Sequence, residues 1–399
     1  MEKNSIKRLY IMPEVWETVT QSQVFNWITL INGNGISTDC LSITSEKIGN
    51  EKVKEIEKSI SGEFIQIKSR LMLIGDIFLI LFLLKYYFKN KNRYKKIVFQ
   101  TRLSSIGLTF YLLNVLLPKA KFIFESRAAG NEERKLREKE KNMNLKLRIK
   151  GSYFELSEQL MVTESDRIFC VSNSLKEYYI NKYNLIDSNF TVFPGAADSN
   201  LFYLDKKLRT EVRKEFKLKD DEILVVYSGR LEKKWEIPDK IITFFNDLYA
   251  INSKFKLLLI TPDINLAKNL IHQYELKEIS FIRKVDLNEV NKYLNGADIG
   301  LLLREDIPMN NVASPTKFAE YLMSGLPVII SHGIHDFSNV IRNSRYGVVV
   351  NNLDGISLKE YTKLSNSLEI ENVKIATWGK NKLSKKTFIK KYIESLKSI

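Results

Sequence analysis

Residues 311–330, NVASPTKFAEYLMSGLPVII, predict a short helix with both ends marked, followed by a strand. Ser314 is expected to cap the helix, because its hydroxyl can accept a hydrogen bond from a free N–H group of the first turn. Pro315 follows at the first helical position, where its missing N–H group costs nothing. Gly325 supplies the left-handed residue beyond the C-terminus, and the apolar residues 326–330 then predict a buried strand.

The predicted helix has two different faces. Phe318 and Leu322 are spaced for contact with a core, whereas Thr316, Lys317 and Glu320 fall together on another face. The second face joins a helix N-terminus, with its free N–H groups and positive dipole, to a lysine, and this combination favours an anion. Glu320 lies about 7.5 Å further along the axis, from roughly five residues at the helical rise. A ligand with phosphate at one end and hydroxyls at the other fits this spacing, although a capped amphipathic helix without a ligand has the same pattern.

The motif Ser-Pro-Thr-Lys-Phe-Ala-Glu-Tyr-Leu-x-Ser-Gly-Leu-Pro-Val-Ile resembles the donor-binding signature of the family 4 glycosyltransferases, the glycosyl transferases group 1. Members of this family are retaining enzymes of the GT-B fold. The resemblance therefore implies an α/β protein with two Rossmann-like, doubly wound domains that face each other across a cleft. It also implies that residues 314–317 hold the diphosphate of a nucleotide sugar and that Glu320 holds the ribose.

A second stretch with phosphate-binding character is SGRLEKKW, residues 228–235, directly after the predicted strand 223–227. A glycine turn with cations at a strand end, before a helix, suits a phosphate. The family has Gly-Arg-Leu followed by a lysine at this place, so the resemblance implies that Arg230 and Lys234 contact the diphosphate and neutralise the leaving group. Here Lys234 comes one residue earlier than in the commonest family pattern.

The resemblance also implies where the nucleotide base lies, near Thr261 and against the backbone of residues 283–285. The residues expected to be catalytic are Arg230, Lys234 and Glu320. The residues expected to bind the donor are Gly229, Arg230, Lys234, Thr261, Val285, Ser314, Pro315, Thr316, Lys317 and Glu320.

The family often shows two glutamates eight residues apart, and this chain departs from that pattern. The second glutamate is Glu320, but the first position is Val312. Either a neighbouring polar group (Asn310, Asn311 or Glu305) serves instead, or the backbone alone holds the sugar. No Asp-x-Asp stands clearly at a strand end, so we expect no metal site and no cofactor, with the nucleotide sugar acting as a substrate.

The N-terminal part has the β-loop-α-β order that opens a doubly wound sheet: a strand at 9–12, a helix at 19–31 and a strand at 36–43. In GT-B enzymes the loop after the first strand faces the cleft and is often glycine-rich. The corresponding loop, residues 13–18, contains no glycine.

Charged residues follow two later strands of this domain. Arg102 comes after the predicted strand 96–99, and Glu125 and Arg127 come after the strand 121–124. Ligands of open α/β sheets bind outside these strand ends. The arrangement resembles the Arg and the Asp-x-Arg-Gly of family members, which implies that Arg102, Glu125 and Arg127 bind the acceptor. A structural salt bridge between Glu125 and an arginine remains the alternative.

The chain of 399 residues is long enough for two domains and is strongly basic, since Lys and Arg exceed Asp and Glu by 62 − 47 = 15. This excess suggests a polyanionic partner, although a charge spread along the whole chain also describes an ordinary solvated surface. Aromatic residues are not interleaved with the basic clusters as a nucleic-acid stacking platform requires, so we expect no nucleic acid. Cys40 and Cys170 are too far apart in sequence to suggest a disulfide framework or a zinc site.

The most apolar run is residues 71–88, LMLIGDIFLILFLLKYYF. Its uninterrupted core is short for a bilayer span, so a buried helix is the favoured interpretation. The alternative is a helix at a membrane surface, with the basic residues that follow it meeting anionic headgroups. With no signal peptide recognised at the N-terminus, we expect a cytoplasmic protein, or one that is peripheral on the inner membrane face.

The domains expected are an acceptor-binding domain at 1–193, a nucleotide-sugar-binding domain at 194–377 and a C-terminal helix at 378–399 that packs back on the first domain. The function expected is retaining, metal-independent transfer of a sugar to a glycan or polyprenyl-linked acceptor, in cell-surface polysaccharide synthesis. The alternatives left open are a non-catalytic GT-B protein that binds a nucleotide sugar, a nucleotide-sugar epimerase and, more distantly, a basic nucleic-acid-binding protein.

Overall fold

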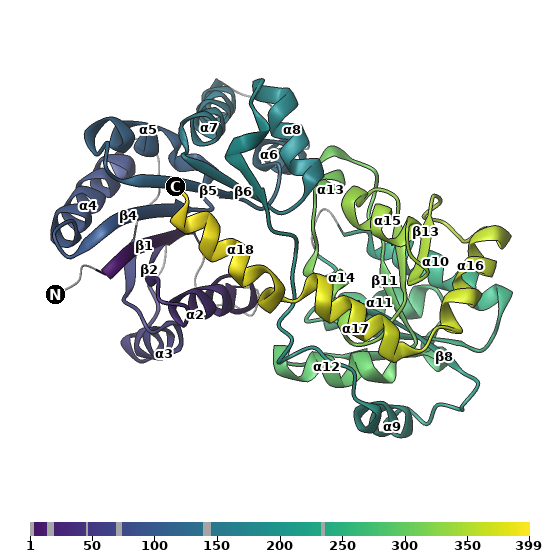
Figure 1. Cartoon of the computed structure of the whole chain (residues 1–399). Helices are drawn as coiled ribbons and strands as arrows, with labels where there is room; N and C mark the ends of the chain where they lie inside the picture. Colours follow the sequence, from purple (N-terminus) through teal and green to yellow (C-terminus); the bar gives the residue numbers. More distant parts are fainter. Residues whose placement is uncertain (1–3, 14–19, 45–46, 69–73, 139–144, 233–235) are drawn as a thin grey trace. The chain divides into compact units, whose positions relative to one another are not determined.

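The computed structural model describes residues 4–13, 20–44, 47–68, 74–138, 145–232 and 236–399. It forms two compact units, each an α/β assembly around one sheet (Figure 1). The first unit contains Met1–Phe193 and Phe388–Ile399, and the second contains Pro194–Thr387.

The sheet of the first unit is parallel, with the strand order β3-β2-β1-β4-β5-β6-β7. Its strands are β1 (Asn4–Met12), β2 (Ser37–Thr44), β3 (Phe64–Lys68), β4 (Tyr94–Thr101), β5 (Lys121–Ser126), β6 (Arg167–Cys170) and β7 (Phe190–Val192). The chain runs outward from β1 to β3 and then returns to β4 on the other side of β1. This reversal makes the sheet doubly wound and places a topological switch point between β1 and β4.

Helices link these strands. They are η1 (Gln21–Phe25), α2 (Asn26–Asn32), α3 (Asn50–Ile60), α4 (Ile74–Asn90), η2 (Ser104–Ile106), α5 (Gly107–Leu116), α6 (Gly130–Glu138), α7 (Leu145–Glu164), α8 (Asn173–Tyr183) and η3 (Asp187–Asn189). The segment expected as one helix at 19–31 begins with the π-helical turn η1 before α2. The Ser172 side chain caps α8 by accepting a hydrogen bond from the Leu175 N–H group.

The second unit has a parallel sheet with the order β10-β9-β8-β11-β12-β13. Its strands are β8 (Ile223–Ser228), β9 (Phe255–Ile260), β10 (Ser280–Arg283), β11 (Ile299–Leu302), β12 (Val328–Ser331) and β13 (Gly347–Val350). Its helices are α9 (Lys206–Glu215), α10 (Pro238–Ile251), α11 (Ile264–Gln273), η4 (Lys277–Ile279), α12 (Leu287–Gly296), α13 (Pro308–Asn311), α14 (Thr316–Met323), α15 (His335–Arg342), α16 (Leu358–Leu368) and α17 (Asn372–Leu383). The switch point of this sheet lies between β8 and β11, where ligands of such sheets bind.

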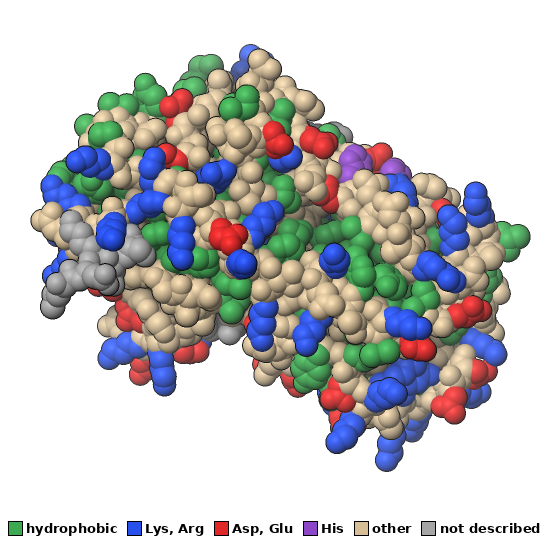
Figure 2. Space-filling model, in the orientation of Figure 1, with side chains coloured by type: hydrophobic (Ala, Val, Ile, Leu, Met, Phe, Trp, Pro, Cys, Tyr) green, Lys and Arg blue, Asp and Glu red, His purple; other side chains and the backbone are tan. Residues whose placement is uncertain are grey.

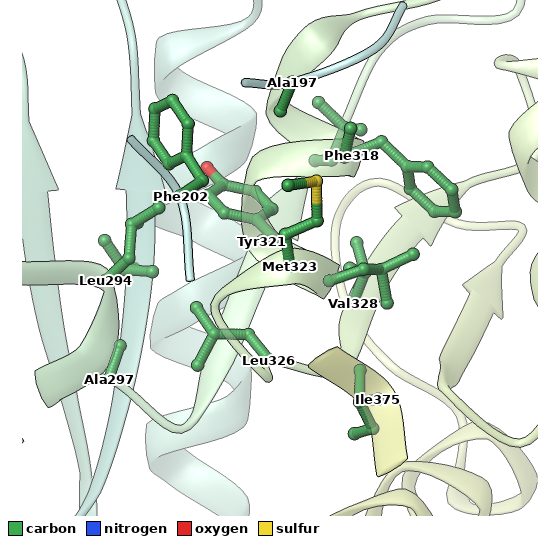
Figure 3. Close-up of a cluster of buried hydrophobic side chains, with 14 of the residues drawn as sticks. Ala197, Phe202, Leu294, Ala297, Phe318, Tyr321, Met323, Leu326, Val328 and Ile375 are labelled. Atoms are coloured by element: carbon green, nitrogen blue, oxygen red, sulfur yellow. The ribbon is translucent and has the colours of Figure 1, made fainter. Parts of the chain in front are cut away.

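The core of the second unit surrounds α14 (Figure 3). Phe318 and Leu322 are fully buried, as their spacing predicted, and the Phe318 ring stacks on Phe337 with 4.2 Å between the ring centroids. Gly325 has φ = +84°, which confirms the left-handed residue expected after the helix. Packing of this face fixes the direction in which the opposite face of α14 presents its polar side chains.

The C-terminal region differs from the single segment expected at 378–399. It contains two helices, α17 and α18 (Lys385–Lys397), with Ser384 in extended conformation between them. From Phe388 onward, α18 belongs to the first unit. There Tyr392 packs on Phe169 and Phe193, with ring centroids 5.0 and 4.8 Å away.

The apolar run forms α4, except for residues 71–73, which lie outside the described residues. Leu79 and Leu83 are buried, so the buried-helix interpretation holds for one side of α4. On the other side Phe78 and Leu81 are 64% and 58% exposed. No described helix is long and apolar enough to cross a membrane.

Candidate functional site

The end of β8 is shaped by a glycine that no other residue could replace without strain. Gly229 follows the buried strand directly and has φ = +144°, while its N–H group donates to the Ile260 carbonyl at 2.8 Å. A Cβ atom at this position would lie 2.3 Å from the Lys317 ammonium nitrogen. The glycine therefore allows the lysine of α14 to lie directly against the backbone at the end of β8.

Lys317 is held there by a buried polar cluster. Its ammonium nitrogen lies 3.3 Å from Glu236 Oε1 and 3.2 Å from the Tyr227 hydroxyl, and 4.5 Å from the centre of the Tyr227 ring. Glu236 Oε1 also accepts a hydrogen bond from Arg304 Nη2 at 3.0 Å. The Glu236 carboxylate thus pairs with two cations. Lys317 lies against the end of β8, and Arg304 follows β11.

The charged groups of this cluster shift the pKa values of one another. Burial by itself would raise the pKa of Glu236, but the Lys317 and Arg304 cations outweigh it, so the pKa lies below its ordinary value. Burial lowers the pKa of Lys317, and Glu236 opposes that shift. The carboxylate is therefore ionised when the site is at neutral pH, and it balances part of the positive charge.

The predicted cap of α14 is wrong in its detail. Pro315 occupies the N-cap position, and no side chain caps the helix there. Ser314 instead accepts a hydrogen bond from the Gly195 N–H group at 2.8 Å, because it lies one residue too early to reach the first turn. A Cβ atom on Gly195 would lie 2.2 Å from the Ser314 carbonyl oxygen, so the turn at 194–195 packs closely under the helix start.

The first turn of α14 keeps the features of an anion site. Thr316 and Lys317 are the first two helical residues, and helical geometry gives their N–H groups no partner within the helix. The next N–H group, that of Phe318, already has a partner, since it donates to the Pro315 carbonyl at 3.2 Å. Two N–H groups and a lysine therefore lie beside the end of β8.

Glu320 is half-buried, one helical turn after Thr316. Burial raises the pKa of Glu320, while Lys317 and a hydrogen bond with Thr316 oppose the shift. The structure thus places Thr316, Lys317 and Glu320 along one side of α14, as the sequence predicted.

Of the two expected catalytic cations, the structure describes Arg230 but not Lys234. Arg230 is exposed, and its carbonyl oxygen lies 2.7 Å from the Tyr227 hydroxyl. Lys234 lies outside the described residues. The loop after Arg230 is anchored because Asp263 accepts a hydrogen bond from the Leu231 N–H group at 2.7 Å.

Thr261 and Val285, the residues expected near the base, lie at adjoining strand ends. The Thr261 N–H group donates to the Arg283 carbonyl at 2.9 Å, and Thr261 is buried. Val285 is partly buried against the core that surrounds α14. The carboxyl ends of β8, β9 and β10 and the start of α14 thus belong to one edge of the second unit.

Around the missing first glutamate, the structure offers buried amides. Val312 is buried, whereas Glu305 is exposed. Asn310 is fully buried, and its Nδ2 group donates to the Glu305 carbonyl at 3.0 Å. In the described part of the chain, the Oδ1 atoms of Asn310 and Asn311 have no hydrogen-bond partner, so these two amides are the polar atoms left available here.

In the first unit, Glu125 has several partners. Its carboxylate pairs with Arg127 at 3.0 Å and accepts hydrogen bonds from Tyr10 at 3.0 Å and Gln100 at 2.7 Å. These contacts favour the structural salt bridge that the sequence left open, since both carboxylate oxygens are engaged. Arg102 lies after β4, with Nη2 3.4 Å from Gln23 Oε1.

Sequence reasoning missed Glu236 and Tyr227 and did not assign Arg304 a role. Tyr227 is the penultimate residue of β8 and Arg304 follows β11, so proximity to a switch-point strand could have identified both. Glu236 lies shortly before α10, and no comparable sequence pattern pointed to it.

Comparisons with known proteins bear on this geometry. Residues 209–381, which contain β8, Arg230 and α14, match the family model of glycosyl transferases group 1. This segment is a group 1 glycosyltransferase domain. No curated protein sequence matches the chain.

The whole chain resembles solved structures. A glycosyltransferase from Rickettsia africae matches with a TM-score of 0.73 and 15% identity, covering 99% of this chain and 98% of that one. HepE from Anabaena, crystallised with UDP, matches with a TM-score of 0.67 and 10% identity, covering 99% and 100%. A UDP-GlcNAc 2-epimerase from Neisseria meningitidis, bound to UDP-GlcNAc, matches with a TM-score of 0.55 and 12% identity, covering 98% and 100%. These likenesses confirm the GT-B fold that the sequence resemblance implied.

Proposed function

We propose that the chain is a retaining glycosyltransferase that moves a sugar from a nucleotide sugar to a glycan or polyprenyl-linked acceptor in cell-surface polysaccharide synthesis. The observation that carries the proposal is the contact of Lys317 with Gly229, which brings the start of α14 against the end of β8. This contact joins the two elements suited to bind phosphate, the first turn of α14 and the turn after β8, at the switch point of the second sheet. Both elements lie inside the segment that matches the family model. A nucleotide diphosphate fits such a cluster of N–H groups and cations.

The chemistry follows from where charge develops. Breaking the bond between the anomeric carbon and the diphosphate leaves negative charge on the departing nucleotide. Arg230, Lys234 and the N–H groups of the first turn of α14 would stabilise that charge, a type of interaction worth about 3–4 kcal/mol for a single donor. Glu320 would accept hydrogen bonds from the ribose hydroxyls, and Thr261 would lie near the base.

The sugar itself would lie near the buried amides. Val312 cannot bind a hydroxyl through its side chain, so Asn310, Asn311 and the neighbouring backbone would hold the sugar of the donor. Their unpartnered Oδ1 atoms support this assignment. The acceptor would bind near Arg102 and Arg127 of the first unit, with Glu125 positioning Arg127.

An epimerase is the second candidate, because the fold also matches an enzyme bound to UDP-GlcNAc. Incubating the purified protein with a panel of nucleotide sugars and candidate acceptors separates the two functions. Transfer releases the free nucleotide diphosphate and yields a glycoside with the anomeric configuration of the donor. Epimerisation leaves a nucleotide sugar with altered stereochemistry, and inversion at the anomeric carbon would contradict the retaining mechanism.

We further propose that the protein needs no metal or cofactor and works at the cytoplasmic face of the membrane. The first part rests on the cations and N–H groups, which can take over the charge neutralisation that a divalent ion supplies in other transferases. The second part rests on the basic charge and on the surface described next.

A further inference from the structure

The first unit carries an apolar surface on α4 and α5 that faces solvent. On α4 the exposed side chains are Ile77, Phe78, Leu81 and Phe88, between 53% and 64% exposed. On α5 they are Tyr111, Leu112, Val115 and Leu116, between 39% and 66% exposed. We call these eight residues the α4–α5 face. Monomeric proteins rarely leave large adjoining apolar side chains in water without a partner for them.

The two helices present this face in one layer. Tyr86 of α4 packs on Phe99 of β4, and Phe110 of α5 packs on Phe122 of β5, with ring centroids 6.2 and 5.2 Å apart. Phe99 and Phe122 contact each other on the same side of the sheet, with centroids 5.6 Å apart. Both helices therefore cover one side of the sheet, and their outward sides adjoin. Figure 2 shows hydrophobic side chains over α5 and toward α4, with Lys and Arg side chains beside them.

The exposed charges on α4, on α5 and in the turns that follow them have one sign, although Lys89 at the end of α4 pairs with Glu63, which precedes β3, at 3.5 Å. Lys85 lies one turn after Leu81 on the exposed side of α4, and Lys91, Arg93 and Lys119 are exposed just beyond the ends of α4 and α5. Because these helices precede neighbouring parallel strands, their C-terminal ends lie at the same edge of the sheet.

No acid on the two helices balances those cations. The sequences of α4 and α5 contain one acidic residue, Asp76. It is buried, and it accepts hydrogen bonds from Thr109 at 3.2 Å and from Tyr153 at 2.7 Å. On these two helices the exposed side thus combines apolar side chains with positive charge.

We propose that the α4–α5 face docks on an anionic lipid bilayer. This docking extends the proposed function and rests on it only in so far as the acceptor is lipid-linked. The apolar side chains enter the boundary between headgroups and acyl chains, and the lysines extend to the lipid phosphates. A second copy of the face fits less well, since a symmetric interface would bury Lys85 opposite two helices that carry no exposed acid. A bilayer supplies both the apolar depth and the negative charge.

Flotation of the full chain with vesicles tests the proposal. One vesicle type contains phosphatidylcholine alone, and the other also contains phosphatidylglycerol. We expect binding to the phosphatidylglycerol vesicles that weakens with added salt. The double variant Phe78→Gln, Val115→Gln should lower the partition coefficient by at least about tenfold, because two exposed apolar side chains no longer enter the lipid. Lys85→Gln and Lys119→Gln should each lower it about fivefold.

The matched control is Leu358→Gln with Val373→Gln, two positions of the second unit that are 80% and 54% exposed. This control should bind vesicles like the wild type, and all variants should unfold at the wild-type temperature. Absence of vesicle binding by the wild type would overturn the proposal, as would wild-type binding by the Phe78, Val115 variant. Concentration-dependent dimers that this variant abolishes, without vesicle binding, would assign the face to a second copy instead.

Nucleotide-sugar binding, measured by calorimetry without lipid, is a separate readout. A wild-type chain that binds vesicles but no nucleotide sugar contradicts the proposed function and leaves the docking surface standing. A chain that binds and transfers the sugar but never binds vesicles supports the proposed function and contradicts the docking surface.

Discussion

The hydroxyl of Tyr321 in α14 accepts a hydrogen bond from the Ser228 N–H group at the end of β8, at 2.9 Å. Tyr321 is fully buried, and its ring lies against Gly300 of β11, where a Cβ atom would come within 2.4 Å of the ring. This contact fixes the helix that carries Thr316, Lys317 and Glu320 to the strand end that carries Gly229 and Arg230. The proposed donor site would therefore depend on a buried tyrosine whose hydroxyl is engaged by the backbone of β8.

Tyr321→Phe should weaken this link. It leaves a buried N–H group without its partner, so we expect the free energy of unfolding to fall by about 1–3 kcal/mol, together with weaker nucleotide-sugar binding. Urea denaturation and calorimetry measure the two effects. The control is Tyr361→Phe, whose hydroxyl makes only a 3.5 Å contact with Asn252. Equal behaviour of the two variants would show that the Ser228 contact does not matter.

Gly229→Ala should damage both the strand end and the site. The backbone has φ = +144°, and the added methyl would lie 2.3 Å from the Lys317 ammonium nitrogen. We expect a loss of about 1–3 kcal/mol in the free energy of unfolding and loss of donor binding, because the lysine must move. Gly49→Ala is the control, since an added Cβ atom there meets nothing within 4 Å. Undisturbed donor binding by Gly229→Ala would contradict the assignment of Lys317.

Arg230→Ala and Lys234→Ala should each lower the transfer rate by about 10²–10³-fold, because each removes a charge that is proposed to stabilise the leaving diphosphate. Arg230 is exposed, so its variant should keep the wild-type unfolding temperature. Arg345→Ala, which changes another exposed arginine of the same unit, should transfer normally. Wild-type rates in both site variants would remove these residues from the mechanism.

Chelation tests the proposal that transfer needs no metal. Rates measured with and without EDTA should agree if cations and N–H groups of the chain neutralise the diphosphate as proposed. A complete loss that Mg²⁺ or Mn²⁺ restores would refute this prediction.

Glu320→Gln should separate stability from function. Burial raises the pKa of Glu320 above its ordinary value of 4.5, so the folded chain holds this proton to higher pH than the unfolded chain. The contribution of Glu320 to the free energy of unfolding therefore falls as pH rises from about 4.5 through the folded pKa. The variant lacks this fall, so its stability relative to the wild type should improve as pH rises above about 4.5.

Donor binding should respond in the opposite direction. The amide replaces a carboxylate that would accept two ribose hydrogen bonds, so affinity for the nucleotide sugar should fall at neutral pH. Glu278→Gln, at an exposed position, should change neither quantity. A pH-independent stability difference for Glu320→Gln would show that the carboxyl titrates normally.

Local features of the site could be predicted from the sequence because each is encoded within one or two helical turns. The spacing of Phe318 and Leu322 identified the buried side of α14, and Gly325 marked its end. The glycine and cations after β8 identified a second phosphate-suited element for the same reason. Strand ends of parallel sheets share an edge, so the sequence also predicted which elements would meet.

Partners that are distant in sequence were decided only by the tertiary structure. Lys317 and Glu236 are 81 positions apart, and Ser314 and Gly195 are 119 apart, so no local pattern joins them. The apolar run on α4 shows the same limit, because its sequence is apolar on all sides. Which side chains reach solvent was determined when α4 and α5 packed in one layer on the sheet, since a helix of that composition can bury either side until its neighbours are fixed.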